Sequence, residues 1–415
     1  MATTNWDELT AKLFGLRRFG IKPGLGRLRS ALDEQGNQGE AYPVIMVAGT
    51  NGKGTVASMI GAILQAHGYR VGLYTSPHLI SVRERFRVDG EPLSREAVEP
   101  VLRRLLDVYG GDGDEKKEHL TFFEMTTLAA VSLFADCAVD FGVFEVGLGG
   151  RLDAVNALEP AISVVTTVGR DHTRYLGEEI TEIAAEKAGI FRRGVPAVIG
   201  RQEHEDAHRK LVERANDAGA EPVVAERGDG SAARQDILRR HEQTARWAVE
   251  VLLGESQSDK AFDDGYKRWR WPGRFDEIAF NGDGRRGFVD AAHNAAGLRA
   301  LARAVKQRDR QIGAVIWASM RDKDPGGIGE FLSHVGAPVW GSLVVNERAR
   351  TAAQLRDFVP DALWQGAAVT ERCIEAVSKE SNGDVLIFGS VFLVGEVFAA
   401  LGRDVPSLKT YVDED

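Results

Sequence analysis

The chain has 415 residues, of which 43% are hydrophobic and 27% charged, and its formal net charge at pH 7 is −9. This length allows two to three domains with full cores, and the acidic balance argues against a broad nucleic-acid surface. No apolar run approaches a membrane span and no N-terminal signal is recognised, while Cys137 and Cys373 match no disulfide or metal spacing. We therefore expect a cytoplasmic protein that binds neither nucleic acid nor membrane.

Two short helices are expected in residues 5–33, and a strand–loop–helix unit follows them. The five apolar residues Val44–Ala48 predict a buried strand, and Val56–His67 has the pattern of a helix. Glycines in the turn between them let main-chain N–H groups approach an anion, and a lysine adds a positive charge. We predict a phosphate-binding loop rather than an ordinary glycine turn, and it comprises Gly49, Thr50, Asn51, Gly52, Lys53, Gly54 and Thr55.

The next part of the chain alternates strands with helices. Arg70–Pro77 is expected to be a short strand that ends in polar residues, with Ser76 near its end. Ser94–Tyr109 is expected to be an amphipathic helix capped by its serine. Thr121–Ala135 is apolar nearly all round, which indicates a buried helix. The arginine-rich stretch Leu79–Gly90 is consistent with a solvated loop on its composition alone.

Two further strands bring polar residues to the same edge of the sheet. Val139–Arg151 contains Glu145, and Ala161–Val168 is followed by Asp171 and His172. Alternation of strands and helices predicts a parallel sheet, whose ligand crevice lies at the carboxyl ends of the strands. Oxygen atoms of Ser76 and Glu145, with His172, suit a Mg²⁺ that bridges phosphate oxygens. The alternatives are that Glu145 pairs with Arg151 and that His172 is a buried, satisfied histidine.

The remaining chain indicates a domain boundary at Trp269. A helix over Thr181–Gly189 carries Lys187 in its last turn, where the helix dipole alone would favour it. A strand over Pro196–Gly200, a loop at 226–233 and a helix over Ile237–Leu253 complete the first domain. After the boundary, helices and strands alternate again from the strand Gly287–Asp290; the others are Leu298–Gln307, Gly313–Ala318, Gly327–Val335, Val339–Val345, Ala352–Phe358, Cys373–Lys379 and Val385–Phe388.

Taken together, these motifs resemble those of the Mur ligase superfamily, and closely those of its folate branch, folylpolyglutamate synthase/dihydrofolate synthase. The resemblance covers about Leu13 to Phe398, and its motifs are Gly49–Thr55, Tyr74–Leu79, Glu84–Arg85, Leu120–Glu124, Glu145–Ala154, Asp171–His172, Glu186–Ile190, Trp271–Arg274, Asp290 with His293–Asn294, Asp322–Asp324 and Gly389–Glu396. It implies an α/β fold: a P-loop-type parallel-sheet ATPase domain that binds ATP, magnesium and folate (1–268), then a smaller Rossmann-like glutamate ligase domain (269–415).

The resemblance also implies roles for individual residues. Lys53 and Thr55 would hold the ATP phosphates, and Lys187 matches a family lysine that is carbamylated. The implied catalytic set is Lys53, Lys187 and His293, and the implied metal ligands for Mg²⁺ are Ser76, Glu145 and His172. Besides the phosphate loop, Arg274 and Asp290 would bind the nucleotide. Substrate contacts are implied for Ser76, Pro77, His78, Arg85, Phe122, Phe123, Arg151 and Asp153, although the two phenylalanines are equally compatible with a core role.

The implied activity is ATP-dependent addition of L-glutamate to a folate, and to dihydropteroate, through an acyl phosphate. Such chemistry needs positioning and cations rather than a protein nucleophile, and we expect a monomer. Where the family usually has Gln and an adenine-contacting Asn, this chain has Glu242 and Ala245. The alternatives are a Mur-type ligase for another carboxylate and a nucleotide-binding protein that has lost catalysis.

Overall fold

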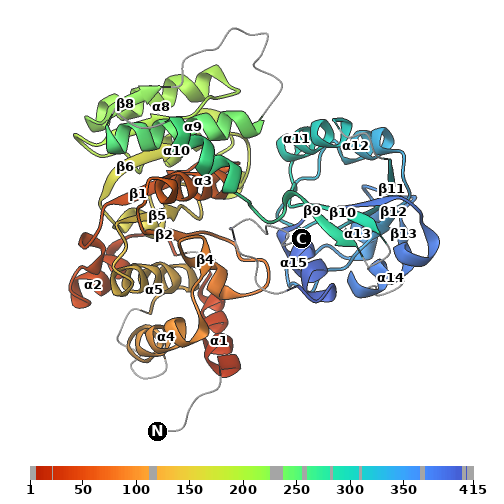
Figure 1. Cartoon of the computed structure of the whole chain (residues 1–415), viewed down its shortest axis with the longest axis horizontal. Helices are drawn as coiled ribbons and strands as arrows, with labels where there is room; N and C mark the ends of the chain where they lie inside the picture. Colours follow the sequence, from red (N-terminus) through yellow and green to blue (C-terminus); the bar gives the residue numbers. More distant parts are fainter. Residues whose placement is uncertain are drawn as a thin grey trace. The chain divides into compact units, whose positions relative to one another are not determined.

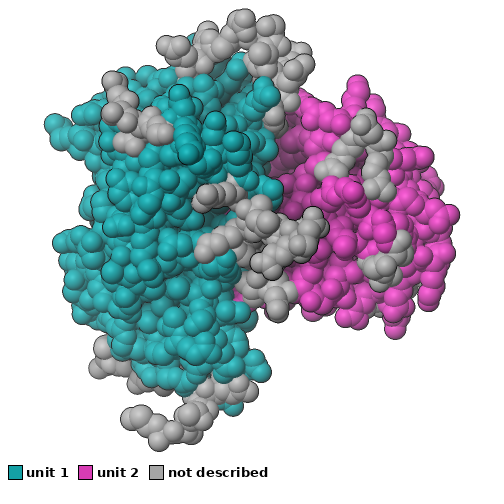
Figure 2. Space-filling view, viewed as in Figure 1, with its two compact units in different colours: residues 1–76, 82–270, 407–415 teal, residues 77–81, 271–406 magenta. Residues whose placement is uncertain are grey.

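The computed structural model describes residues 6–20, 22–111, 119–224, 237–254, 259–280, 284–307, 311–364, 370–403 and 408. The loop expected at 226–233 lies outside these residues. Two compact units make up the chain (Figure 2): unit 1 contains Met1–Ser76, Val82–Arg270 and Ser407–Asp415, and unit 2 contains Pro77–Ser81 and Trp271–Pro406.

Unit 1 is built on an eight-stranded sheet in the order β4-β3-β2-β5-β1-β6-β7-β8. All neighbouring strands are parallel except β2–β3 and β3–β4, so the predicted parallel sheet is confirmed and carries a short antiparallel edge. The strands are β1 Val44–Ala48, β2 Val71–Tyr74, β3 Phe86–Val88, β4 Glu91–Pro92, β5 Phe141–Glu145, β6 Pro160–Val165, β7 Pro196–Ile199 and β8 Glu221–Val224.

Helices cover this sheet in two groups (Figure 1). Helix α3 packs on β1, β2 and β5 and is flanked by α9 and α10, whereas α5 packs on β2 and β3 beside α2 and α4. The α-helices are α1 Trp6–Gly15, α2 Gly26–Glu34, α3 Lys53–Ala66, α4 Arg95–Tyr109, α5 Phe122–Asp136, α6 Thr173–Leu176, α7 Ile180–Ala188, α8 Glu205–Ala218, α9 Ile237–Leu253 and α10 Asp259–Arg268. Short 3₁₀ turns are η1 Leu16–Phe19, η2 Gln38–Glu40, η3 Val82–Arg85 and η4 Ala154–Ala157.

Local chemistry explains two of these helix starts. The Ser94 hydroxyl accepts a hydrogen bond from Ala97 N and so caps α4. Helix α5 begins with a capping box in which Thr121 and Glu124 satisfy each other's main-chain N–H groups. Nearly every residue of α5 after its first turn is buried, as the apolar pattern predicted.

The arginine-rich stretch is not a solvated loop. It forms η3 and β3, and Glu84, Arg85 and Arg87 are only 5%, 5% and 2% exposed. Burial lowers the pKa of Arg87 to about 10, while Glu84 and Glu91 partly oppose the shift. Composition alone therefore gave the wrong expectation of a solvated loop, because acidic and basic side chains of this stretch offset each other's charge inside the fold.

Unit 2 has a six-stranded sheet in the order β13-β12-β11-β14-β10-β9, antiparallel only between β9 and β10. Its strands are β9 Arg274–Phe280, β10 Arg285–Asp290, β11 Ile312–Trp317, β12 Val339–Gly341, β13 Leu363–Trp364 and β14 Asp384–Phe388. Its helices are α11 Ala295–Lys306, α12 Ile328–Val335, α13 Ala352–Arg356, α14 Thr370–Glu380 and α15 Val391–Ala400. Two apolar clusters form its core, and Leu79 and Ile80 of the short segment Pro77–Ser81 pack against one of them.

Among the described helices, none combines the length and the apolar character that crossing a membrane would require.

Candidate active site

The phosphate loop connects β1 to α3, and two of its glycines have conformations and surroundings that exclude a side chain. Gly49 has φ +151°, and a Cβ atom there would lie 1.9 Å from Thr166 Oγ1. Gly52 has φ +81° and precedes the first residue of α3; its Cβ would lie 2.3 Å from the His241 ring. The main chain therefore packs directly against Thr166 and the His241 ring. The loop leads into a helix N-terminus, where the first N–H groups have no partner within the helix.

The loop is fastened to the end of the neighbouring strand β6. Both Thr166 Oγ1 and Thr167 Oγ1 donate hydrogen bonds to Asn51 O, at 2.8 and 3.1 Å. Thr50 N donates to Thr167 O at 2.6 Å, and the Thr50 hydroxyl bonds to Gly169 O at 3.0 Å. These bonds fix the main chain before a ligand arrives, which reduces the ordering cost of binding.

Two lysines meet on one carbonyl of this loop. Lys53 Nζ donates to Gly49 O at 3.2 Å and to Thr50 O at 3.3 Å. Lys187 Nζ, from the last turn of α7, donates to Gly49 O at 2.9 Å, and Lys187 is 3% exposed. Two ammonium groups on one acceptor repel each other in a low-dielectric site. A bound anion, or conversion of one lysine into a negative group, would relieve that repulsion.

Glu145 and Ser76 come together from the ends of neighbouring strands β5 and β2. Glu145 Oε2 accepts a hydrogen bond from Ser76 N at 2.8 Å, and Glu145 is 4% exposed. Glu145 also lies one strand away from β1, which leads into the phosphate loop. A carboxylate and a hydroxyl are hard oxygen donors of the kind that Mg²⁺ prefers.

His172 follows β6, on the other side of β1. Its φ of 53° is in the left-handed region. Its main-chain N–H donates to Asp171 Oδ1 at 2.8 Å, and its side chain is 33% exposed. His172 is therefore not the buried histidine of the alternative interpretation. Among the residues that the structure describes, no three His, Cys, Asp or Glu side chains gather as a metal cluster. A Mg²⁺ here would fit a site that hydroxyls, phosphate and water complete, which is the usual arrangement for this ion.

The glycine-rich loop after β5 carries Arg151 and Asp153. Arg151 donates through Nε and Nη2 to Glu186 Oε1, at 3.0 and 2.8 Å, so its ion pair is with Glu186 and not with Glu145. Both carboxylate oxygens of Asp153 accept main-chain N–H groups, from Leu148 at 2.8 Å and Val155 at 3.0 Å. Burial raises the pKa of Asp153 to about 6, against these hydrogen bonds and the charge of Lys53, which lower it.

Phe122 and Phe123 lie on the first turn of α5, and both are partly buried. The Phe122 ring has the guanidinium groups of Arg17 and Arg85 at 4.8 and 5.0 Å from its centroid. The Phe123 ring lies 5.9 Å from that of Tyr74 and so close to Gly147 that a Cβ atom there would be 2.6 Å from Phe123 Cζ. Burial lowers the pKa of Arg85, which Tyr74, Glu145 and Glu84 raise.

The other predicted residues belong to unit 2. Asp290 accepts hydrogen bonds from Phe275 N at 2.8 Å and Ala292 N at 2.7 Å, and burial raises its pKa although Arg274 opposes the shift. Arg274 Nη1 donates to Gly273 O at 3.0 Å, and His293 Nδ1 lies 2.7 Å from Ala291 O. Arg274, Asp290 and His293 thus gather at the paired ends of β9 and β10. Pro77 and His78 lie in the segment that belongs to unit 2.

Two residues near the phosphate loop were not among the predicted site residues: His241 of α9 and Trp269, which follows α10. His241 is 6% exposed and covers Gly52, while Ala245 on the same helix is fully buried. Trp269 Nε1 donates to Ser58 Oγ at 2.8 Å, and this hydroxyl donates to Thr55 O at 2.9 Å. A buried histidine facing a glycine has no signature in the sequence, because the two are 189 positions apart, as 241 − 52 gives.

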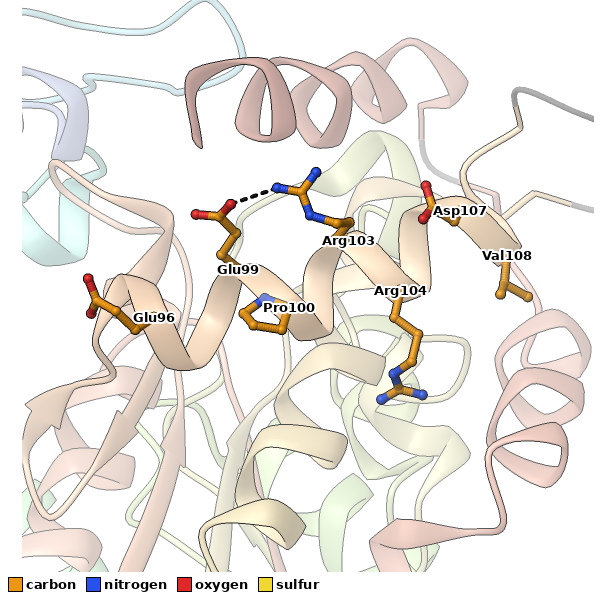
Figure 3. Close-up of a pocket in the computed structure, with 7 residues that line it drawn as sticks. All are labelled: Glu96, Glu99, Pro100, Arg103, Arg104, Asp107 and Val108. Atoms are coloured by element: carbon orange, nitrogen blue, oxygen red, sulfur yellow. Dashed lines mark hydrogen bonds and ion pairs between the residues drawn. The ribbon is translucent and has the colours of Figure 1, made fainter. Parts of the chain in front are cut away.

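A surface pocket on α4 is separate from these residues (Figure 3). Its lining residues all come from α4 and include the ion pair of Glu99 with Arg103 at 2.6 Å; they are Glu96, Glu99, Pro100, Arg103, Arg104, Asp107 and Val108. None of them is a predicted site residue, and the charged groups are those of an ordinary solvated helix face.

Comparisons with known proteins find relatives of this chain in both sequence and structure. Residues 47–251 match the Mur ligase middle domain. The dihydrofolate synthase/folylpolyglutamate synthase of Bacillus subtilis is 31% identical over 95% of this chain and 98% of its own length. The structure of E. coli FolC in complex with DHPP and ADP has a TM-score of 0.83 at 29% identity and covers 95% of this chain and 97% of its own. The bifunctional folylpolyglutamate synthase/dihydrofolate synthase of Yersinia pestis, complexed with AMPPNP and Mn ion, has a TM-score of 0.82 at 29% identity, covering 97% and 99%.

Proposed function

The chain belongs to the dihydrofolate synthase/folylpolyglutamate synthase family, and we propose that it is an ATP-dependent ligase joining the amine of L-glutamate to the carboxylate of a folate. The observation that carries this proposal is the phosphate loop with its two lysines, Lys53 and Lys187, on Gly49 O. Such a site is positively charged and pre-formed before any nucleotide arrives. It suits a reaction in which phosphate oxygens must be held and neutralised.

The proposed reaction has two steps. A carboxylate oxygen of the folate attacks the γ-phosphorus of ATP, ADP leaves, and an acyl phosphate forms. The glutamate amine then attacks the acyl carbon and loses a proton, and inorganic phosphate leaves with the C–O bond electrons. A bound Mg²⁺, held by Ser76, Glu145 and His172, would neutralise phosphate charge.

The chain's own residues position the reactants. The loop N–H groups and Lys53 hold the phosphates, and Thr55 offers its hydroxyl to a phosphate or the ion. The charge state of Lys187, whose Nζ contacts Gly49 O, determines the net charge of the loop's surroundings. From unit 2, we propose Arg274 and Asp290 as nucleotide ligands and His293 as a catalytic residue. The proposed folate contacts are Ser76, Pro77, His78, Arg85, Phe122, Phe123, Arg151 and Asp153.

We infer that dihydropteroate is a second substrate. Its carboxylate lies closer to the pterin than the terminal carboxylate of a folate does, so it reaches ATP only from a deep pocket. We propose that Arg85 and Phe122 form the inner wall of this pocket, since Arg85 is buried and its guanidinium lies over the Phe122 ring. We place the enzyme in the cytoplasm and expect it to act as a monomer.

ADP release tests the proposal. We expect purified protein with ATP, Mg²⁺ and L-glutamate to release ADP on addition of a tetrahydrofolate and, separately, of dihydropteroate. Lys53→Ala should lose at least about 100-fold in turnover, while Lys260→Ala, an exposed lysine of α10, should remain active. Release with tetrahydrofolate alone contradicts the second substrate. Release with neither favours a ligase for another carboxylate, or a nucleotide-binding protein without catalysis.

A further inference from the structure

An ion pair joins α2 to the first turn of α5, two elements that lie side by side (Figure 1). Arg27 Nε and Nη2 donate to Glu124 Oε1, at 3.1 and 2.8 Å. Arg27 Nη2 also donates to Lys22 O at 2.7 Å, so the same guanidinium holds the segment that precedes α2. The two side chains are 14% and 5% exposed.

Glu124 is committed on both of its oxygens. Besides the bonds from Arg27, its Oε2 accepts from Thr121 N at 2.8 Å, and the Thr121 hydroxyl accepts in return from Glu124 N at 3.3 Å. A capping box by itself requires no cation, because its two residues satisfy each other's main-chain N–H groups. Here the carboxylate is buried, and Arg27 compensates its charge with fixed fork geometry.

The turn that this ion pair fixes carries Phe122 and Phe123. The guanidinium groups of Arg17 and Arg85 both lie close to the Phe122 ring, and Phe123 packs on Gly147 of the loop that follows β5. Because both rings extend from consecutive residues of one turn, a shift of that turn moves both walls together. The link therefore runs from Arg27 through Glu124 to the two aromatic rings.

We propose that Arg27 and Glu124 are positioning residues for the folate pocket, setting the place of the Phe122 and Phe123 rings against the flat heteroaromatic ring of the substrate. This inference rests on the proposed function. Neither residue touches the phosphate loop in any contact described above. Their loss should therefore weaken folate binding and leave nucleotide binding and the chemical step largely unchanged.

The test compares Arg27→Met, Glu124→Gln and their combination with Arg29→Met, which removes an exposed arginine from the same helix. We expect KM for the folate substrate to rise about tenfold in both single variants, with kcat and KM for ATP within about twofold of wild type. The double variant should be no worse than the singles, because the two residues act as one unit. Arg27→Lys, which keeps the charge without the fork, should recover part of the loss.

Thermal unfolding separates this role from simple stabilisation. Glu124→Gln retains a side chain that can form the capping box, so it should stay folded at the assay temperature. An unchanged folate KM in the folded variants overturns the positioning role and leaves the proposed function standing. A rise in KM for ATP equal to that for the folate has the same consequence. Wild-type protein that ligates neither folate nor dihydropteroate overturns the proposed function and this inference with it.

Discussion

Replacement of Gly52 by alanine perturbs the phosphate loop where a side chain has neither the conformation nor the space it needs. A left-handed backbone costs an L-residue roughly 1–2 kcal/mol, and Gly52 has φ +81°. The new Cβ atom would lie 2.3 Å from Cε1 and Nε2 of His241, a residue only 6% exposed. Overpacking of this kind costs about 1–3 kcal/mol, so the whole change costs about 2–5 kcal/mol.

We expect this cost to appear in both stability and nucleotide binding. Gly52→Ala should lower the midpoint of thermal unfolding, and KM for ATP should rise at least about tenfold, because a loss of about 1.4 kcal/mol already has that effect. The matched control is Gly61→Ala in the same helix. Its Cβ atom would lie 3.8 Å from Val71 Cγ1, an ordinary contact, and alanine there should be neutral or stabilising by about 0.5–1 kcal/mol.

A double-mutant cycle isolates the contact with His241. In a His241→Ala background, Gly52→Ala should cost only the backbone part, so the penalty should fall by about 1–3 kcal/mol. Denaturant unfolding and ATP kinetics are measured for all four proteins. The reasoning is refuted if Gly52→Ala behaves like Gly61→Ala, or if its penalty is the same with and without the His241 ring.

Three further predictions follow from the same site. Lys187→Ala should lose activity and regain part of it with added short carboxylates, if Lys187 is carbamylated; a fully active variant would show that the lysine serves only the helix end. Because burial raises the pKa of Asp153 from 3.8 to about 6, its folded form holds the proton more tightly. The stability of ligand-free wild type relative to Asp153→Asn should therefore fall as pH rises from about 4 to about 6, and equal pH slopes in denaturant unfolding would contradict this. Trp269→Phe should lower stability by about 1 kcal/mol through loss of its hydrogen bond to Ser58, and no loss would show that water replaces the bond.

The sequence was most informative where apolar runs and glycines coincide. Val44–Ala48 alone predicts a buried strand, and the glycines after it predict a tight turn into a helix, both of which the structure contains. That this turn binds phosphate stays a prediction. Helix α3 nevertheless starts at Lys53, three residues before the apolar pattern begins at Val56. The reason is Gly52, whose left-handed conformation starts the helix inside the loop.

Other features depend on partners that are distant in the chain. Strand β9 was missed because Arg274–Phe280 carries three charged residues, and only Ile278 and Phe280 are buried in it. From the sequence Arg85 was compatible with a solvated loop. In the structure its guanidinium lies over the ring of Phe122, which is 37 positions later in the chain (122 − 85). Likewise Arg151 pairs with Glu186 on α7, which no spacing within its own motif indicates. The roles of the two domains and of the individual site residues stay predictions.

Transfer of an oxygen isotope tests the central claim, acyl phosphate formation, most directly. Dihydropteroate or tetrahydrofolate labelled with ¹⁸O in its reacting carboxylate is incubated with the protein, ATP, Mg²⁺ and L-glutamate, and the inorganic phosphate is analysed by mass spectrometry. Because one carboxylate oxygen attacks the γ-phosphorus and leaves with phosphate, each new amide bond should place one ¹⁸O in phosphate. Amide formation with unlabelled phosphate would contradict the account.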